Sequence, residues 1–203
     1  MLTLYHAPMS RSSRIVTLID EMGIGDKIEI RTVMIRRRDG SGGVDPANPH
    51  PEGKVPCLVH DGTVITESAA IILYLTALFP HSGMAPLPGT AKRGEYLTWL
   101  FYYGSVMEPV MYLQMADVTS PMLQGNYRGP AEVAARLFKA LERSPFLLGD
   151  SYSAADLLVH SPFAWMPDYT PDVPAIRDWV ARCQARPSVG RTNAFDAARM
   201  AVA

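Results

Sequence analysis

The spacing of apolar and polar side chains changes several times in the first third of the chain. Residues 2–6 alternate between the two kinds, which predicts a short strand. From Ser12 to Met22 apolar residues recur every three or four positions, which predicts a helix that Gly23 ends. Residues 28–33 alternate again. A strand, a helix and a strand with short connections form a βαβ unit, so we expect the two strands to be parallel.

The next elements follow a stretch rich in Arg, Gly, Asp and Pro at residues 36–53, which predicts a long, mobile loop. Residues 57–60 and 63–65 are two short apolar runs on either side of an Asp-Gly turn, a pattern that favours a hairpin. A helix is predicted over 66–79, with Thr, Glu and Ser at its start as the cap.

The rest of the chain is expected to be helical. Residues 80–89 hold three prolines and two glycines, which is typical of a linker. The predicted helices beyond it are 91–116, 130–143, 154–166, 173–185 and 188–200. The sequence thus predicts an α+β domain over 1–79, a linker over 80–89 and an all-α helical-bundle domain over 90–203.

Composition and charge exclude several classes of protein. With 48% hydrophobic and 19% charged residues, the chain can bury a core, so it is neither disordered nor fibrous. A net charge of −1 gives no reason to expect nucleic acid or an anionic membrane as partner. We expect a cytoplasmic protein, because no signal peptide or membrane helix is visible and Cys57 and Cys183 lie far apart. No metal-ligand spacing occurs, so no metal is predicted.

Two short motifs carry candidate binding chemistry. If the Val55–Pro56 bond is cis, the turn leaves the backbone of Val55 free to pair with an extended peptide; a trans bond would make Pro56 an ordinary strand start. Glu67 and Ser68 open a predicted helix, where free N–H groups and the helix dipole favour a carboxylate. They either cap that helix or hold an α-amino acid head. A peptide with both features would satisfy both sites.

The runs 54–59 (KVPCLV) and 67–75 (ESAAIILYL) resemble the glutathione-binding core of the cytosolic glutathione S-transferases, in particular bacterial-type members with a serine loop. The resemblance implies a thioredoxin-like N-terminal domain and glutathione as cosubstrate. It also implies a cis Pro56, with Val55 pairing with the cysteinyl backbone of glutathione. In the same way, Glu67 and Ser68 would bind the γ-glutamyl head, and Lys54 would contact the glycyl end.

The resemblance extends into the second domain. Residues 147–150 (LLGD) and 153–156 (SAAD) are similar to a signature of the family's helical domain. Ser153 followed three residues later by Asp156 is also the pattern of a capping box, in which each residue satisfies a backbone N–H near the other. We therefore expect Ser153 and Asp156 to serve folding rather than catalysis.

The sulfur activator is sought in residues 8–15 (PMSRSSRI), which resemble the Ser-x-x-Ser-Arg pattern of serine-type members. A hydroxyl there would donate a hydrogen bond to the glutathione thiolate. Lowering a thiol pKa by about two units requires roughly 2.7 kcal/mol. Ser10 is the predicted catalytic residue, with Ser12, Ser13 and Tyr5 as alternatives. The loop holds no cysteine, which argues against glutaredoxin-like or dehydroascorbate-reductase chemistry.

The partner of the glycyl carboxylate and the pocket for the electrophile are each predicted as a set of candidate residues. The segment 48–54 is longer than the usual link in the family, so the glycyl carboxylate has several candidate partners, which are Lys54, Arg36, Arg37, Arg38 and His50. The pocket for a hydrophobic electrophile is expected between the domains. Its candidate residues are Met9, Arg11, Tyr103 and Met107.

The resemblance implies an enzyme, a detoxifying transferase that forms a twofold homodimer and conjugates glutathione to a small hydrophobic electrophile. A glutathione-dependent isomerase or dehalogenase is an alternative with the same type of site. A glutathione-binding or interaction protein without turnover is another, because fold does not fix function.

Overall fold

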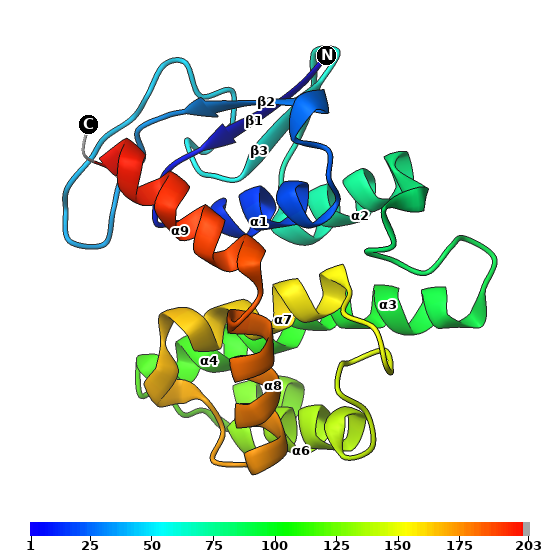
Figure 1. Cartoon of the computed structure of the whole chain (residues 1–203). Helices are drawn as coiled ribbons and strands as arrows, with labels where there is room; N and C mark the ends of the chain where they lie inside the picture. The colour runs from blue at the N-terminus through cyan, green and yellow to red at the C-terminus, as the bar shows by residue number, and fades with distance from the viewer. Residues whose placement is uncertain (201–203) are drawn as a thin grey trace. The chain divides into compact units, whose positions relative to one another are not determined.

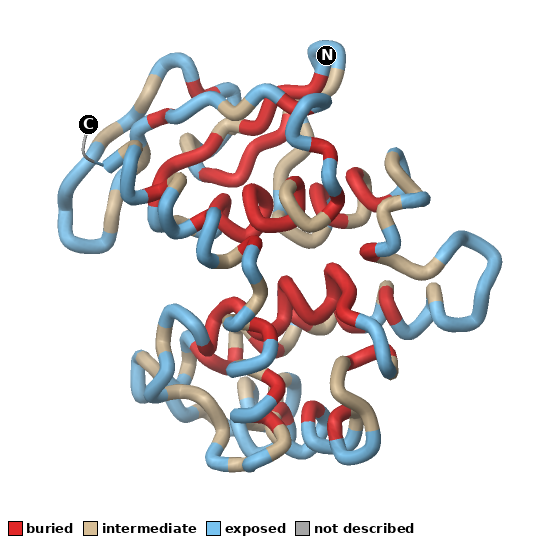
Figure 2. Tube along the Cα trace, in the orientation of Figure 1, coloured by how far each residue is buried: buried red, intermediate tan, exposed pale blue. Residues whose placement is uncertain are grey.

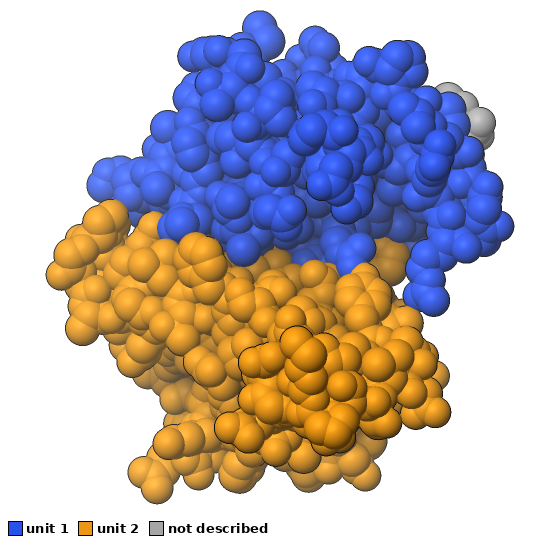
Figure 3. All heavy atoms as spheres, turned by 180° about the vertical axis from the view of Figure 1, so that it is seen from behind, with its two compact units in different colours: residues 1–82, 186–203 blue, residues 83–185 orange. Residues whose placement is uncertain are grey.

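The structure is a computed structural model of the chain, of which residues 1–200 are described. The chain forms two compact units, shown in two colours in Figure 3. One holds residues 1–82 together with the segment that begins at Arg186, and the other holds Gly83–Ala185. Each unit is described separately below.

The first unit is built on a four-stranded mixed sheet, which is visible in Figure 1. Its strands, in spatial order, are β2 (Ile28–Thr32), β1 (Leu2–His6), β3 (Cys57–His60) and β4 (Thr63–Ile65). β1 is parallel to β2 and antiparallel to β3, with Tyr5 opposite Cys57. The predicted βαβ unit and the Asp-Gly hairpin are therefore both present. Because β1 ends where β3 begins, the segments after His6 and before Cys57 are neighbours.

Two helices, α1 (Ser13–Glu21) and α2 (Ser68–Leu78), lie on one face of this sheet (Figure 1). The apolar spacing of α1 turns Ile15 and Leu18 inward, and both are fully buried. Gly23 ends the helix with a backbone φ of 65°, a conformation that costs glycine little. This α+β arrangement confirms the predicted fold class of the N-terminal part.

The last helix, α9 (Pro187–Met200), belongs to the first unit, although the sequence suggested one helical domain over 90–203. It packs alongside α1 (Figure 1). Its polar contacts with α1 include Arg191 to Asp20, Thr192 to Thr17 and Asp196 to Ser13. The predicted boundary differs because helical periodicity identifies a helix but not the surface against which it packs.

The second unit is helical throughout its regular elements. Its helices are α3 (Ala91–Tyr102), α4 (Glu108–Met115), α5 (Pro121–Tyr127), α6 (Pro130–Leu141), α7 (Ala154–Trp165) and α8 (Pro174–Gln184). The predicted helix 91–116 is present but contains a π-helical turn at Tyr103–Met107, and α5 was not predicted. Almost every residue of α7 is buried, as the red segment in Figure 2 shows. Within residues 1–200 no helix combines the length and apolarity required to cross a bilayer.

Asp156 holds the second unit together from inside. The predicted capping box is present, with Ser153 donating to Asp156 Oδ2 from its backbone N at 3.0 Å and from its Oγ at 2.8 Å. Asp156 Oδ1 accepts from Leu147 N at 2.8 Å and from Trp179 Nε1 at 3.0 Å. Burial raises the pKa of Asp156 despite these four hydrogen bonds. One carboxylate thus joins a loop, α7 and α8.

We expect Asp156→Ala to unfold the protein at much lower denaturant concentration. The substitution leaves four donors without an acceptor, and each buried orphan costs about 1–3 kcal/mol, so a loss of about 3 kcal/mol or more is expected. Urea unfolding followed by tryptophan fluorescence measures this. Asp178→Ala, which removes an exposed carboxylate from α8, is the matched control and should change stability by less than about 0.5 kcal/mol. Equal effects of the two substitutions would contradict the role given to Asp156.

Candidate functional site

The candidate site begins with the serine loop, residues 7–12, which connects β1 to α1. Met9 has a φ of 53°, a left-handed conformation that is unfavourable for a residue with a Cβ. Its side chain is exposed, and its backbone N donates to Asp196 Oδ2 at 2.7 Å. Ser10 follows it and is half-buried, just before the start of α1. The loop is therefore held in a strained shape by a carboxylate from α9.

The three serines of this region have different environments. Ser12 is fully buried, and its Oγ lies 2.8 Å from His6 Nδ1 while accepting from Ala7 N at 3.1 Å. Ser13 is also buried, and its Oγ donates to Asp196 Oδ2 at 2.5 Å. Ser10 is the half-buried member of the three, and its Oγ lies 2.7 Å from both Ala7 O and Ser12 Oγ. Ser12 and Ser13 are thus committed to the interior of the unit.

A buried His6–Asp196 pair lies behind the serines. His6 Nε2 and Asp196 Oδ1 are 3.0 Å apart, within ion-pair distance, but the geometry between them is not that of a hydrogen bond. Burial raises the pKa of Asp196, but the adjacent His6 and the hydrogen bonds from Ser13 and the Met9 N–H outweigh it, so the net shift is downward. Asp196 is therefore an ionised carboxylate at neutral pH, enclosed by donors.

The Val55–Pro56 peptide bond is cis, as the resemblance implied. Val55 packs in a small apolar cluster with Ala7 and Val33, and Tyr5 lies against the same cluster. This contact places Val55 directly beside the serine loop. The half-buried Tyr5, which was the alternative hydroxyl, serves as part of this packing.

Glu67 and Ser68 stand at the N-terminus of α2. Glu67 occupies the N-cap position with a φ of 65°, and no side chain accepts a hydrogen bond from the first turn. The expected side-chain cap from residues 66–68 is therefore not formed. A non-glycine residue held in this conformation costs about 1–3 kcal/mol, and such strain is common where a ligand is held. The first N–H groups of α2 remain available to an anion.

The candidates for the glycyl end lie on the long loop before β3. Lys54 is exposed and pairs with Glu52, while its carbonyl accepts from Asn48 Nδ2 at 3.0 Å. Arg37 Nη2 donates to Pro8 O at 2.9 Å, so this guanidinium reaches the serine loop. Desolvation lowers the pKa of His50, whose Nδ1 accepts from the Glu52 N–H. Arg36 and Arg38 are exposed.

The candidates for an electrophile pocket differ in environment. Met9 and Arg11 are exposed on the serine loop. Tyr103 and Met107 are buried in the second unit, at 3% and 0% exposure. Both lie on the π-helical turn. Tyr103 Oη donates to Glu108 Oε1 at 3.0 Å. Both side chains pack in the core of the helical unit, and their role in an electrophile pocket stays a prediction.

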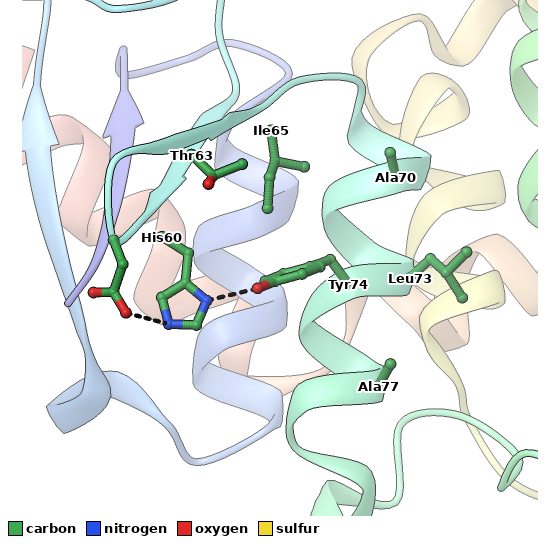
Figure 4. A pocket seen from close by; sticks show the side chains of 8 residues that line it. His60, Thr63, Ile65, Ala70, Leu73, Tyr74 and Ala77 are labelled. Carbon is green, nitrogen blue, oxygen red and sulfur yellow. Dashed lines mark hydrogen bonds and ion pairs between the residues drawn. The ribbon is translucent and has the colours of Figure 1, made fainter.

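A pocket of about 590 Å³ lies elsewhere on the first unit, between the β3–β4 hairpin and α2 (Figure 4). His60 Nδ1 and Tyr74 Oη, 2.6 Å apart, form part of its wall, together with apolar side chains of α2. None of the predicted site residues lines it. Within residues 1–200 no cluster of three potential metal ligands occurs.

Sequence reasoning missed His6 and Asp196. Nothing in the local pattern around either residue identifies a partner, because they are far apart in the chain and meet only when α9 packs on α1. The one available signal is an acidic residue on the apolar side of a predicted helix. Asp196 lies on that side and is 1% exposed.

Comparison with known proteins agrees with this geometry. Residues 4–83 match the N-terminal domain model of glutathione S-transferases, and residues 110–187 match the C-terminal domain model. The disulfide-bond oxidoreductase YfcG of Escherichia coli is 26% identical over 94% of both chains.

Solved structures show the same architecture. A glutathione transferase from Methylococcus capsulatus is 28% identical with a TM-score of 0.77, covering 97% of this chain and 99% of its own. A sphingomonad glutathione S-transferase complexed with glutathione is 27% identical with a TM-score of 0.75, covering 96% and 98%. Since the two domain models match in order and together span most of the chain, this protein belongs to the glutathione S-transferase family.

Proposed function

We propose that this protein binds glutathione, stabilises its thiolate with the hydroxyl of Ser10 and conjugates the sulfur to a small hydrophobic electrophile. The observation that carries the proposal is the position of Ser10. It is the half-buried serine of the loop, at the N-terminal end of α1 and next to the segment that contains the cis Val55–Pro56 bond. The sphingomonad relative that was solved with glutathione supports the choice of ligand.

Glutathione has an α-amino acid head and an extended backbone, and the first unit offers a partner for each. The strained Glu67 supplies a carboxylate for the ammonium, and Ser68 with the start of α2 supplies donors for the α-carboxylate. Val55 pairs with the cysteinyl backbone in this proposal, which directs the sulfur toward the serine loop. Lys54 or Arg37 is then the cation for the glycyl carboxylate.

Two effects at the serine loop favour a thiolate. A hydrogen bond to a charged group contributes about 1.5–3 kcal/mol, and the N-terminus of α1 adds about 0.3–1 kcal/mol. Their sum is on the order of the 2.7 kcal/mol that a two-unit shift of the thiol pKa requires. The first turn of α1 contains no acidic residue of its own, and the opposing Asp196 carboxylate from α9 is partly compensated by hydrogen bonds from Ser13 and the Met9 N–H.

The nucleophile must come from the ligand. Cys57 and Cys183 are both fully buried, and burial raises the pKa of the Cys57 thiol to about 11. Cys57 therefore stays a thiol at neutral pH, and Cys183 is buried away from a ligand. A thiol reaction at this site depends on the sulfur of bound glutathione.

Disulfide exchange is a second candidate, favoured by the likeness to the oxidoreductase YfcG over 94% of both chains. In that reaction the glutathione thiolate attacks a disulfide, forms a mixed disulfide and releases the other sulfur as a thiolate. It uses the same activated sulfur as conjugation. Parallel assays with 1-chloro-2,4-dinitrobenzene and with a small disulfide distinguish the two activities.

We expect bound glutathione to show thiolate absorbance in the ultraviolet at neutral pH, with a pKa well below 8.5. Ser10→Ala should raise this bound pKa by about one to two units while leaving glutathione affinity nearly unchanged, because the lost hydrogen bond is specific to the anion. A pH titration of the absorbance measures both. Ser120→Ala, at a half-buried serine before α5, is the control and should have no effect. If the bound thiol pKa stayed as low in Ser10→Ala as in the wild type and rose in Ser13→Ala, the role would pass to Ser13.

The affinity for glutathione should depend on Glu67 and Ser68, which bind the amino acid head of the ligand in this proposal. Glu67→Gln and Ser68→Ala should each weaken glutathione binding roughly tenfold, because each removes a charge-assisted contact of about 1.5 kcal/mol. The pKa of the remaining bound thiol should not change. Isothermal titration calorimetry gives the affinity, with Glu95→Gln as a control for an exposed carboxylate in the helical unit. Unchanged affinity in both variants would show that the head of the ligand binds elsewhere.

A further inference from the structure

We propose that His6 accepts the glutathione thiol proton through Ser12 and Ser10, and that Asp196 stabilises the imidazolium that results. This inference rests on the proposed function and assigns a proton acceptor to the same site. Four side chains from β1, the serine loop and α9 form one continuous row. The distances are 2.7 Å from Ser10 Oγ to Ser12 Oγ, 2.8 Å from Ser12 Oγ to His6 Nδ1 and 3.0 Å from His6 Nε2 to Asp196 Oδ1.

The direction of the hydrogen bonds follows from counting protons. Asp196 is ionised and can only accept, so the proton of a neutral His6 lies on Nε2, which faces it. His6 Nδ1 is then unprotonated and accepts from Ser12 Oγ. Ser12 has one hydroxyl proton, so Ser10 must be the donor at the contact between the two serine oxygens, and its proton has to turn there from Ala7 O, which is equally close at 2.7 Å. With both hydroxyls turned from the Ala7 carbonyl, every donor along the row points from Ser10 toward His6, which is the arrangement that inward proton transfer requires.

The proposed step is balanced. The S–H bond of glutathione breaks and its electron pair stays on sulfur. The thiol proton passes to Ser10 Oγ, the Ser10 proton to Ser12 Oγ, and the Ser12 proton to His6 Nδ1, where a new N–H bond forms. Both serines end neutral, each having received and given one proton. Ser10 then donates its new proton to the thiolate in a hydrogen bond.

One carboxylate and two guanidinium groups lie around His6 and the serine loop. Asp196 lies within ion-pairing distance and is buried with it, so their attraction is weakly screened. The ring centroid of Phe195 from α9 is 5.7 Å from that of the imidazole, and the guanidinium carbon of Arg199 lies 3.3 Å from the Phe195 centroid. Arg37 is the cation that binds the serine loop, at the carbonyls of Pro8 and Met9. Imidazole is also the side chain that normally exchanges a proton near neutral pH.

The geometry follows the logic of a Ser-His-Asp triad, in which the carboxylate orients the imidazole and stabilises its charged form without taking the proton. Two features differ here. A second serine, Ser10, is inserted between the triad-like Ser12 and the reacting sulfur, and the histidine uses Nε2 rather than Nδ1 toward the carboxylate. Ser12 is fully buried and cannot touch a ligand, so Ser10 is the contact with glutathione.

The test compares two ligands on the whole protein labelled with 15N-histidine. Glutathione carries a thiol proton, whereas S-methylglutathione has the same contacts but no proton to give. At neutral pH we expect the His6 ring nitrogens to shift toward imidazolium values with glutathione and not with S-methylglutathione. Thiolate absorbance should appear in the same sample, with less than one proton released to solvent per thiolate formed. The signal lost in His6→Gln assigns the resonance.

His6→Gln provides a second readout, because glutamine keeps hydrogen bonds but cannot take up a proton. We expect about one proton released per thiolate and a roughly 10²-fold lower kcat with a nearly unchanged KM for glutathione. His81→Gln, at an exposed histidine, is the matched control. A thiolate band without any change at His6 would overturn the inference and leave the proposed function intact. Absence of the thiolate band in the wild-type protein would overturn both.

Discussion

The first unit depends on the burial of one carboxylate. Asp196 on α9 accepts hydrogen bonds from Ser13 Oγ and from the Met9 N–H, and it faces His6 Nε2. A buried ionised group is tolerated only when donors surround it, so the helix, the loop and the strand must come together for any of them to be stable in this form. The strained backbone of Met9 is one consequence, since its N–H is directed at this carboxylate. The position of the serine hydroxyls is another.

The second unit is also held together by a buried carboxylate that accepts hydrogen bonds from several elements. Asp156 collects four donors from a loop, α7 and α8, just as Asp196 collects donors from three elements. The two carboxylates differ in the direction of their pKa shifts, because burial dominates at Asp156 whereas the partners of Asp196 outweigh it. Each unit is therefore organised around an acidic side chain that composition alone would assign to the surface.

Much of the fold was predictable from local spacing. The alternation in β1 and β2, the Asp-Gly turn between β3 and β4, and the period of α1 each depend on residues close in the chain. The π-helical turn at Tyr103–Met107 and the short helix α5 were not predictable in this way, because neither changes the hydrophobic period clearly. The attachment of α9 to the first unit depends on pairs such as Asp196 with Ser13. Such pairs exist only once the chain has folded.

In the candidate site, too, some features could be predicted from neighbouring residues and others depend on contacts made only on folding. The motif around Pro56 and the Glu67-Ser68 pair were visible as local sequence, and so was the choice of three serines in one loop. The sequence could not distinguish among those serines, since Ser10, Ser12 and Ser13 differ only in what surrounds them. Burial separates them, because Ser12 and Ser13 are 0% and 8% exposed whereas Ser10 is half-buried.

The burial of Cys57 bears on how well the protein would resist alkylation if it catalyses the proposed conjugation. A protein that brings reactive electrophiles close to a thiolate risks alkylation of its own cysteines. Cys57 immediately follows Pro56, next to the segment assigned to the ligand, yet it is fully buried and its raised pKa keeps it a thiol. In the proposed conjugation the electrophile would therefore meet one nucleophilic sulfur at this site, and that sulfur would leave with the product.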